Sequence, residues 1–223
     1  MREYELNLIS KNIKIIAGVD EAGRGPVAGP LVASAVILNN NLSYEYINDS
    51  KVLSAKKRNE AYERLKEEAL AISYVVIDID IIDKINILEA TKLAMIQAIN
   101  KLSIKPEHVL IDAVKINHQI PNTSIIKGDL KSKSIAAASI VAKVKRDEIM
   151  DEYHQLYPLY DFNNNKGYLT KKHREAITLY GPIKIHRRSF EPIKSIVNKW
   201  SIIFNTSFFK QKCENLYIII YNY

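Results

Sequence analysis

Short apolar, β-branched segments alternate along this chain with longer amphipathic segments. The first two, Ile13–Val19 and Leu31–Leu38, flank the loop EAGRGPVAGP, and we predict that they form two paired strands. Further strands are predicted at Ser73–Ile79, Val109–Ile111 and Ser124–Lys127. Because strands and helices are mixed along one stretch of chain, the sequence predicts a single α/β domain.

The intervening segments have the apolar spacing of helices with one buried face. They run from Ser54 to about Ala71, from Leu88 to Leu102, from Ser132 to about Tyr153, and onward from near Thr170 and near Pro192, with Gly181-Pro182 as a stop signal between the last two. The small residues Ala136–Ser139 would let the third of these helices pack close to the sheet.

Composition excludes several classes of protein. With 223 residues, 47% hydrophobic and 26% charged, the chain can bury a sizeable core, which excludes disorder and a disulfide-stapled miniprotein. Cys213 is the single cysteine, so an intramolecular disulfide and a thiolate zinc cluster are excluded. No apolar run approaches the roughly 18 residues of a membrane span, and the N-terminus does not resemble a signal peptide. We therefore expect a cytoplasmic protein without a membrane partner.

Positive charge is concentrated in the C-terminal third. The formal net charge is +7, but Asn163–Lys212 carries 11 basic and 2 acidic residues, so that segment holds +9 and the remainder −2. This distribution is typical of a surface that binds a phosphate backbone. A solvated, lysine-rich helix surface is the alternative.

Four carboxylates follow apolar segments: Asp20, Glu21, Asp112 and Asp129. If the strands lie side by side, these residues meet at one edge of the sheet, although Asp20 and Glu21 would converge only if the backbone turns between them. Crowded carboxylates favour oxygen-bound Mg²⁺ or Mn²⁺. Two such ions about 3.5–4 Å apart would support hydrolysis of a phosphodiester. The alternative is that these acids are turn residues or helix caps, above all Asp129.

Several ordered motifs resemble one family. They are GVDEAGRGPVAGPLVASAVIL at 18–38, NDSKVLS at 48–54, INILEAT at 85–91, VLIDA at 109–113, KGDLKSKSIAAASIVAKVKRD at 127–147, GYLTKKH at 167–173 and HRRSF at 186–190. Together they resemble ribonuclease HII, a type 2 ribonuclease H, from about residue 13 to about residue 204.

The resemblance implies a ribonuclease H-like mixed sheet flanked by helices over residues 1–204, with a helical, substrate-binding C-terminal part from about 163 to 204. Residues 205–223 match nothing in this picture, and their role is open. The implied activity is cleavage 5′ to a ribonucleotide in RNA–DNA hybrids and DNA duplexes, leaving 3′-hydroxyl and 5′-phosphate ends. It serves the removal of misincorporated ribonucleotides. The residues implied to be catalytic and to bind two Mn²⁺ or Mg²⁺ ions are Asp20, Glu21, Asp112 and Asp129.

The resemblance also implies substrate-binding residues. The loop of Gly23, Arg24 and Gly25 matches the segment that reads the 2′-hydroxyl through backbone groups, although alone it resembles a tight turn. Tyr168 matches the tyrosine that packs against the following sugar. The loop of Asn48, Ser50 and Lys51 matches a phosphate contact, or an ordinary turn before a helix.

Other motif residues fit a structural role equally well. We expect His173 to be a hydrogen-bonded packing residue, and Lys143 and Arg146 to form either a solvated ion-pair face or a DNA contact. The cluster His186–Arg188 is open in the same way. The sequence departs from common family residues at Leu169 and Val52. These departures could alter binding of the duplex without affecting the metal ligands.

Three rival functions are considered. Ribonuclease HIII carries an added N-terminal domain, whereas about a dozen residues precede the first predicted strand here. A DNA nuclease on the same fold would use the acids without the GRG loop and its tyrosine. A non-catalytic nucleic-acid-binding protein would use the acids only as caps. We expect a monomer that binds nucleic acid, and contact with a sliding clamp is left open.

Overall fold

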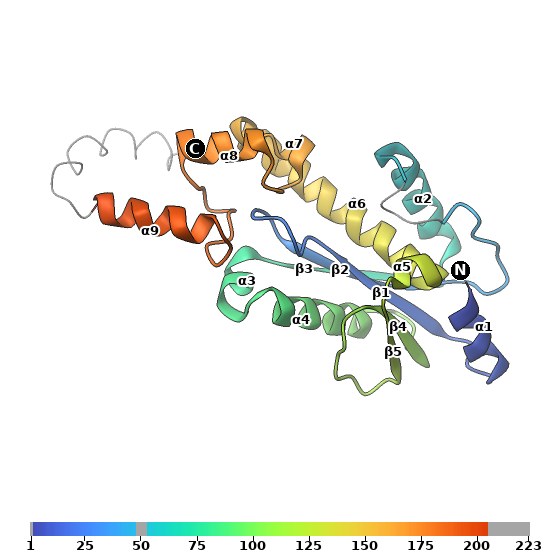
Figure 1. The fold of residues 1–223 in the computed structure, drawn as a ribbon. Helices are drawn as coiled ribbons and strands as arrows, with labels where there is room; N and C mark the ends of the chain where they lie inside the picture. The colour runs from blue at the N-terminus through green and yellow to red at the C-terminus, as the bar shows by residue number, and fades with distance from the viewer. Residues whose placement is uncertain (1, 48–52, 205–223) are drawn as a thin grey trace.

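The computed structural model describes residues 2–47 and 53–204 and builds them around a five-stranded sheet (Figure 1). The strands lie in the order β3-β2-β1-β4-β5. Their bounds are Ile16–Ala22 for β1, Leu31–Ile37 for β2, Ala71–Ile77 for β3, His108–Asp112 for β4 and Asn122–Ile125 for β5. β1 is antiparallel to β2 and parallel to β4, so the predicted mixed α/β sheet is confirmed.

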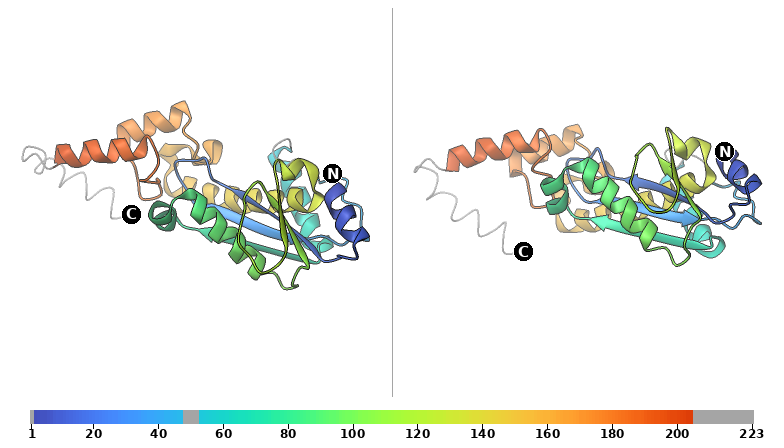
Figure 2. Two further views of the ribbon diagram at one scale, coloured as in Figure 1. Left: turned by 60° about the horizontal axis from the view of Figure 1, so that its bottom comes forward. Right: turned by 90° about the horizontal axis from the view of Figure 1, so that it is seen from below.

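Helices cover both faces of this sheet. α4 (Ile87–Asn100) and α6 (Lys133–Leu156) lie on opposite sides of it (Figure 1). The other helices are α1 (Glu3–Ser10), α2 (Ala55–Glu68), α3 (Ile79–Ile85), α5 (Gly128–Lys131), the 3₁₀ helix η1 (Pro158–Tyr160), α7 (Phe162–Asn165), α8 (Lys171–Tyr180) and α9 (Ile193–Phe204). α1 and α9 lie at opposite ends of the molecule (Figure 2). None of the helices in the described ranges is long and apolar enough to cross a membrane.

The close contact between α6 and β1 depends on small residues. A Cβ atom on Gly18 of β1 would lie 1.9 Å from the backbone carbon of Ser134, so only glycine fits there. On β2, the hydroxyl of Ser34 donates to the carbonyl of Ala138 at 2.6 Å. Ala136, Ala137 and Ala138 are completely buried in this layer. The prediction that this patch packs close to the sheet is confirmed.

The first strand differs from its predicted bounds. It begins three residues later than Ile13, because the Glu107 carboxylate accepts the N–H groups of Lys14 and Ile15 at 2.7 and 2.8 Å. It continues through Ala22, because β2 pairs with it as far as Val32. The carboxylates predicted to follow this strand therefore lie inside it.

Three helices begin where the sequence predicts. Ser132, Thr170 and Ser54 each accept a backbone N–H at a helix N-terminus. Gly181 is the C-cap of α8, as predicted. The structure also contains α1 and α3, neither of which was predicted, because their few apolar residues do not make a clear stripe.

Ser132 links α1 to α6 through two hydrogen bonds of its side chain. Its hydroxyl accepts the N–H of Ile135 at 3.2 Å and donates to the buried carboxylate of Glu5 at 2.6 Å. We expect Ser132→Ala to lower the free energy of unfolding by about 2 kcal/mol in urea titrations, because a cap and a charge-assisted hydrogen bond are both lost. Ser54→Ala, which removes only the cap of α2, should cost about 1 kcal/mol. Equal losses would contradict the role of Glu5.

Candidate active site

Three carboxylates lie where β1 and β4 end. Asp20 and Glu21 are consecutive residues of β1, and Asp112 is the last residue of β4. The two strands are parallel, with Val19 opposite Ile111, so Asp20 and Asp112 follow as neighbours in register. The structure therefore brings together acids that are about 90 positions apart in the chain.

The backbone does not turn between Asp20 and Glu21, so the condition stated for their convergence is not met within the strand. The two residues pair with Ser34 and Ala33 of β2, and the chain turns only at Gly23, whose φ is +103°. Asp20 shares a face with Gly18, the face that α6 covers, and alternation along the strand places Glu21 on the other face.

Hydrogen bonds fix the first two carboxylates differently. Asp20 is 5% exposed, accepts the N–H of Glu21 at 2.7 Å and is hydrogen-bonded to the side chain of Ser139. Glu21 pairs through Oε1 with Arg24 at 3.3 Å. Its Oε2 is buried and lacks a hydrogen-bond partner among the described residues. This oxygen is thus a buried acceptor that a cation could satisfy.

The carboxylates repel one another. Burial raises the pKa of Asp20 well above its usual value, and the charges of Glu21 and Asp112 raise it further. Burial also raises the pKa of Glu21, as does Asp112, while Arg24 opposes the shift. Because a bound cation removes this repulsion, the set of oxygen donors fits a hard divalent ion such as Mg²⁺ or Mn²⁺.

The residues that would hold such an ion are Asp20, Glu21 and Asp112. Within residues 2–47 and 53–204, no three acidic, histidine or cysteine side chains lie in an arrangement that could hold a metal ion. The chain thus supplies buried oxygen donors and an unpartnered Glu21 oxygen rather than a complete coordination shell. Their assignment as ligands remains a prediction.

Asp129 lies one residue from a group that contacts Asp112. It is in the first turn of α5 and is 3% exposed, and the preceding Gly128 donates its N–H to Asp112 Oδ1 at 2.7 Å. The N-cap of α6, the helix predicted to follow Asp129, is Ser132, and that of α5 is Lys127, so Asp129 is the N-cap of neither helix. Its role as a fourth ligand remains a prediction.

The GRG loop and the predicted tyrosine meet. Gly23 directly follows β1, and a Cβ atom there would lie 2.7 Å from the carbonyl oxygen of Pro30. A Cβ atom on Gly25 would lie 3.4 Å from Cε1 of Tyr168, whose side chain is half exposed. Arg24 links the same loop to Glu21. Residues 143 positions apart thus lie side by side near the carboxylates.

Two buried arginines hold this loop, and sequence reasoning missed their role. Arg187 is completely buried and donates to the carbonyl oxygens of Gly23, Arg24, Gly29 and Pro30 at 2.6 to 3.2 Å. Arg146 is 1% exposed and donates to those of Ala28, Pro30 and Lys166 at 2.8 to 3.1 Å. In both cases the guanidinium satisfies backbone carbonyls of the loop.

These contacts correct two expectations. Lys143 forms the predicted ion pair with Asp147, at 2.6 Å, but Arg146 belongs neither to a solvated face nor to a DNA contact, because it is buried in the loop. Arg187 likewise does not contribute to a basic surface. Exposed basic residues of the C-terminal third are Lys171, Lys172, Arg174, Lys184, Arg188 and Lys194.

His173 is the packing residue we expected. It is completely buried, its Nδ1 lies 2.9 Å from the carbonyl oxygen of Tyr168, and its Nε2 lies 3.1 Å from His186 Nε2. The predicted phosphate contacts Asn48, Ser50 and Lys51, and the departure at Val52, lie outside the described residues. Leu169 is partly buried against the apolar cluster around Phe162.

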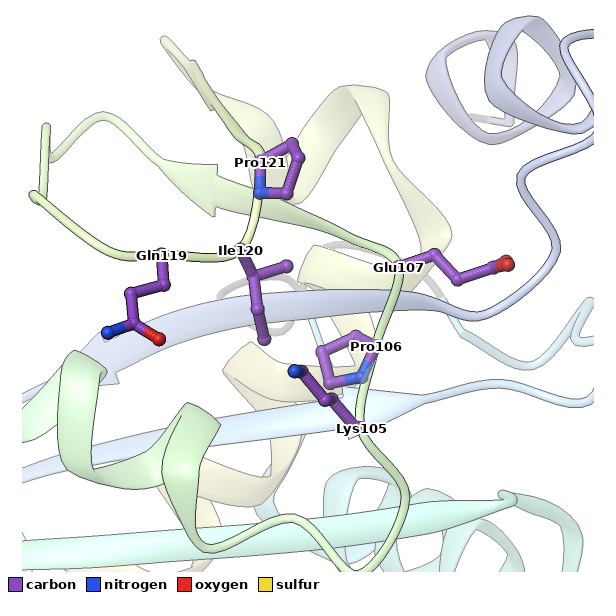
Figure 3. A pocket seen from close by; sticks show the side chains of 6 residues that line it. All are labelled: Lys105, Pro106, Glu107, Gln119, Ile120 and Pro121. Atoms are coloured by element: carbon purple, nitrogen blue, oxygen red, sulfur yellow. The ribbon is translucent and has the colours of Figure 1, made fainter.

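A surface pocket of about 360 Å³ lies away from this site. Its lining comes from the segments before β4 and β5: Lys105, Pro106, Glu107, Gln119, Ile120 and Pro121 (Figure 3). The first three precede the start of β4 at His108 and the last three precede the start of β5 at Asn122, whereas Asp112 ends β4. The carboxylates therefore lie at the opposite end of β4 from this pocket.

A mixed sheet with helices on both faces, and with buried carboxylates where β1 and β4 end, defines the class of ribonuclease H-like nucleases. The ribonuclease H2 of Pyrococcus horikoshii OT3 has this fold: it is 26% identical, with 83% of this chain and 98% of that chain covered, at a TM-score of 0.71. The family model of ribonuclease HII matches residues 17–193, so this chain belongs to the ribonuclease HII family. It is a metal-dependent endoribonuclease.

Two other solved structures share the fold. Ribonuclease HII of Archaeoglobus fulgidus, solved in complex with PCNA, is 24% identical, with 79% of this chain and 95% of that chain covered, at a TM-score of 0.68. Bst ribonuclease HIII, solved in complex with Mn²⁺, is 18% identical, with 83% of this chain and 70% of that chain covered, also at 0.68. The family match favours the HII type over the HIII type.

Proposed function

We propose that this enzyme hydrolyses the phosphodiester bond 5′ to a ribonucleotide, in RNA–DNA hybrids and in DNA duplexes with embedded ribonucleotides. The products carry 3′-hydroxyl and 5′-phosphate ends. The observation that carries this proposal is the position of the Tyr168 ring, 3.4 Å from where a Cβ atom on Gly25 would lie, in the loop that follows the carboxylates of β1. A nuclease that ignored the 2′-hydroxyl would not need a backbone surface and an aromatic ring there.

The roles follow from the surroundings of each group. Asp20, Glu21 and Asp112 would hold two divalent ions, which when bound supply activation of the attacking water and stabilisation of the leaving oxygen. Arg24 keeps one oxygen of Glu21 in place through its ion pair. Asp129, buried next to Gly128, is proposed as the fourth acid.

Recognition is assigned to the GRG loop and Tyr168. Gly23 and Gly25 carry no side chain, so backbone donors and acceptors can reach the 2′-hydroxyl, which both donates and accepts. Tyr168 is half exposed next to Gly25, where its ring would pack on the sugar that follows the ribonucleotide. This arrangement supports a role in removing misincorporated ribonucleotides from DNA. That the enzyme acts as a cytoplasmic monomer is part of the proposal.

The test is cleavage of a labelled DNA duplex that contains one ribonucleotide, against an all-DNA duplex of the same sequence. Each is incubated with Mg²⁺, with Mn²⁺ and with chelator. We expect a metal-dependent nick only on the 5′ side of the ribonucleotide. Cleavage of both duplexes would indicate a DNA nuclease, and no cleavage with either metal would indicate a binding protein.

Tyr168→Ala should weaken selection of an RNA–DNA junction. Loss of one aromatic contact with the nucleotide is worth about 1–3 kcal/mol, so we expect the ratio of kcat/KM for a single ribonucleotide to that for a long hybrid to fall about tenfold. Tyr180→Ala is the matched control, because Tyr180 is 47% exposed against 50% for Tyr168. An unchanged ratio in Tyr168→Ala would contradict the assignment.

A further inference from the structure

Two buried histidines form a directional chain of hydrogen bonds that ends at Tyr168. The Tyr168 carbonyl oxygen can only accept, so His173 Nδ1, 2.9 Å away, carries the hydrogen. In a neutral ring the Nε2 of His173 is then an acceptor. It receives its hydrogen bond from His186 Nε2 at 3.1 Å.

The other end of the chain is consistent with this assignment. With its hydrogen on Nε2, His186 accepts at Nδ1, and the N–H of Ile183 lies 3.0 Å from that nitrogen. Each hydrogen is used once, from Ile183 through His186 and His173 to Tyr168. Ile183 offers His186 Nδ1 both its N–H at 3.0 Å and its carbonyl oxygen at 3.3 Å, so the direction of the chain is set at the other end, by the Tyr168 carbonyl oxygen, which can only accept.

The surroundings keep both rings neutral. Phe162 and Tyr160 pack against His173 with ring centroids 5.2 and 6.3 Å away, and Tyr160 lies 5.4 Å from His186. Burial lowers the pKa of both histidines, that of His186 to about 3. Asp161 is the acidic group that acts on His173, and it opposes the shift without overcoming it.

The chain of histidines is also connected to the loop that touches Tyr168. His186 forms a β-bridge with Ala28, and the N–H of Arg187 donates to the carbonyl of Val27 at 2.8 Å. Val27 in turn donates to the carbonyl of Gly167 at 3.0 Å. The backbone on both sides of the contact between Gly25 and Tyr168 is thus held by the same segment.

We propose that His173 and His186 are positioning residues for ribonucleotide recognition: together they hold the Tyr168 backbone, and hence its ring, against the GRG loop. This inference rests on the proposed function of Tyr168. It assigns the pair no contact with substrate or metal. Its consequence is that a substitution at a completely buried histidine changes selectivity only through the tyrosine.

The test is a double-mutant cycle between His173→Phe and Tyr168→Ala. Phenylalanine keeps an aromatic ring but cannot donate. We expect His173→Phe to raise KM for the single-ribonucleotide duplex and to lower its kcat/KM relative to a long hybrid by roughly five- to tenfold, with kcat on the hybrid nearly unchanged. In the double variant the loss should equal that of Tyr168→Ala alone, because both changes remove one function.

Controls separate positioning from general damage. His154→Phe replaces a partly buried histidine at the end of α6 and should leave the selectivity ratio unchanged. The inference would be overturned if the fold-losses of selectivity in the two single variants multiplied in the double variant. An unchanged selectivity ratio in His173→Phe would overturn it as well. If Tyr168→Ala itself leaves the ratio unchanged, the proposed role of the tyrosine fails, and the inference fails with it.

A measurement on the unmodified enzyme covers the case in which His173→Phe does not fold. Nitrogen chemical shifts of the imidazole rings distinguish the two tautomers. We expect hydrogen on Nδ1 of His173 and on Nε2 of His186 throughout the range from pH 7 to about pH 8. The opposite tautomers, or a protonated His173 in that range, would overturn the inference while leaving the cleavage assay unaffected.

Discussion

Asp20→Asn should abolish cleavage and, at the same time, make the metal-free protein harder to unfold. Replacing the Asp20 carboxylate removes a charged oxygen ligand for the metal ions, which is expected to lower kcat by at least about 10³-fold. The gain in stability follows from removing a buried charge that Glu21 and Asp112 repel. Asparagine is of similar size, and its side-chain oxygen can still accept the N–H of Glu21.

The sign of the stability change follows from the pKa of Asp20. That pKa is raised in the folded protein, so the folded state holds the proton more tightly than the unfolded state does. The wild-type protein therefore loses stability as pH rises above the usual pKa of an aspartate. Asparagine does not titrate, so the variant should exceed the wild type by about 1–3 kcal/mol near pH 8, and by less near pH 4.

Urea titrations in chelator at both pH values, together with the nicking assay, measure both effects. Asp80→Asn is the matched control, since Asp80 is exposed on α3, and it should change neither quantity appreciably. Excess Mg²⁺ or Mn²⁺ should stabilise the wild-type protein and narrow its difference from Asp20→Asn. Normal turnover by Asp20→Asn would contradict the assignment of the metal site, and a less stable variant at pH 8 would contradict the electrostatic argument.

Arg187→Met is the second change with a large expected effect. We expect it to lower the free energy of unfolding by about 3–5 kcal/mol. Methionine retains an apolar stem but cannot donate to the carbonyl oxygens of Gly23, Arg24, Gly29 and Pro30, of which Pro30 keeps a second donor in Arg146. Burial and the charge of Arg146 lower the pKa of Arg187 to about 9. Removing this unfavourably placed charge therefore stabilises the fold and offsets part of the loss in free energy of unfolding. The carbonyl groups of Gly23, Arg24 and Gly29, which lose their Arg187 donor, outweigh that gain, because each unsatisfied acceptor costs about 1–3 kcal/mol.

The neighbouring arginine provides the control. Arg188 is exposed, and Arg188→Met should change stability by less than about 0.5 kcal/mol. Urea denaturation of both variants checks the difference. Arg187→Met should also lose junction selectivity, because Gly23 and Arg24 are no longer held in place. Equal stability of the two variants would show that the loop does not depend on Arg187.

Much of the fold was predictable from the sequence. Apolar β-branched runs, caps at Ser54 and Ser132, and the stop at Gly181 identify most strands and the long helices, because these signals act over a few neighbouring residues. The extension of β1 through Glu21 was not predictable, since it depends on how far the partner strand β2 continues beside it.

The candidate site, like the fold, was predictable from the sequence only in part. The sequence by itself determined which acids, which glycine loop and which tyrosine carry the family resemblance, because the motifs are local. Only the tertiary structure decided that Arg146 and Arg187 are buried supports of the loop rather than basic surface residues. It also decided that His173 and His186 meet behind Tyr168. The physical reason is that burial and hydrogen-bond partners depend on segments far apart in the chain, which a local pattern does not contain.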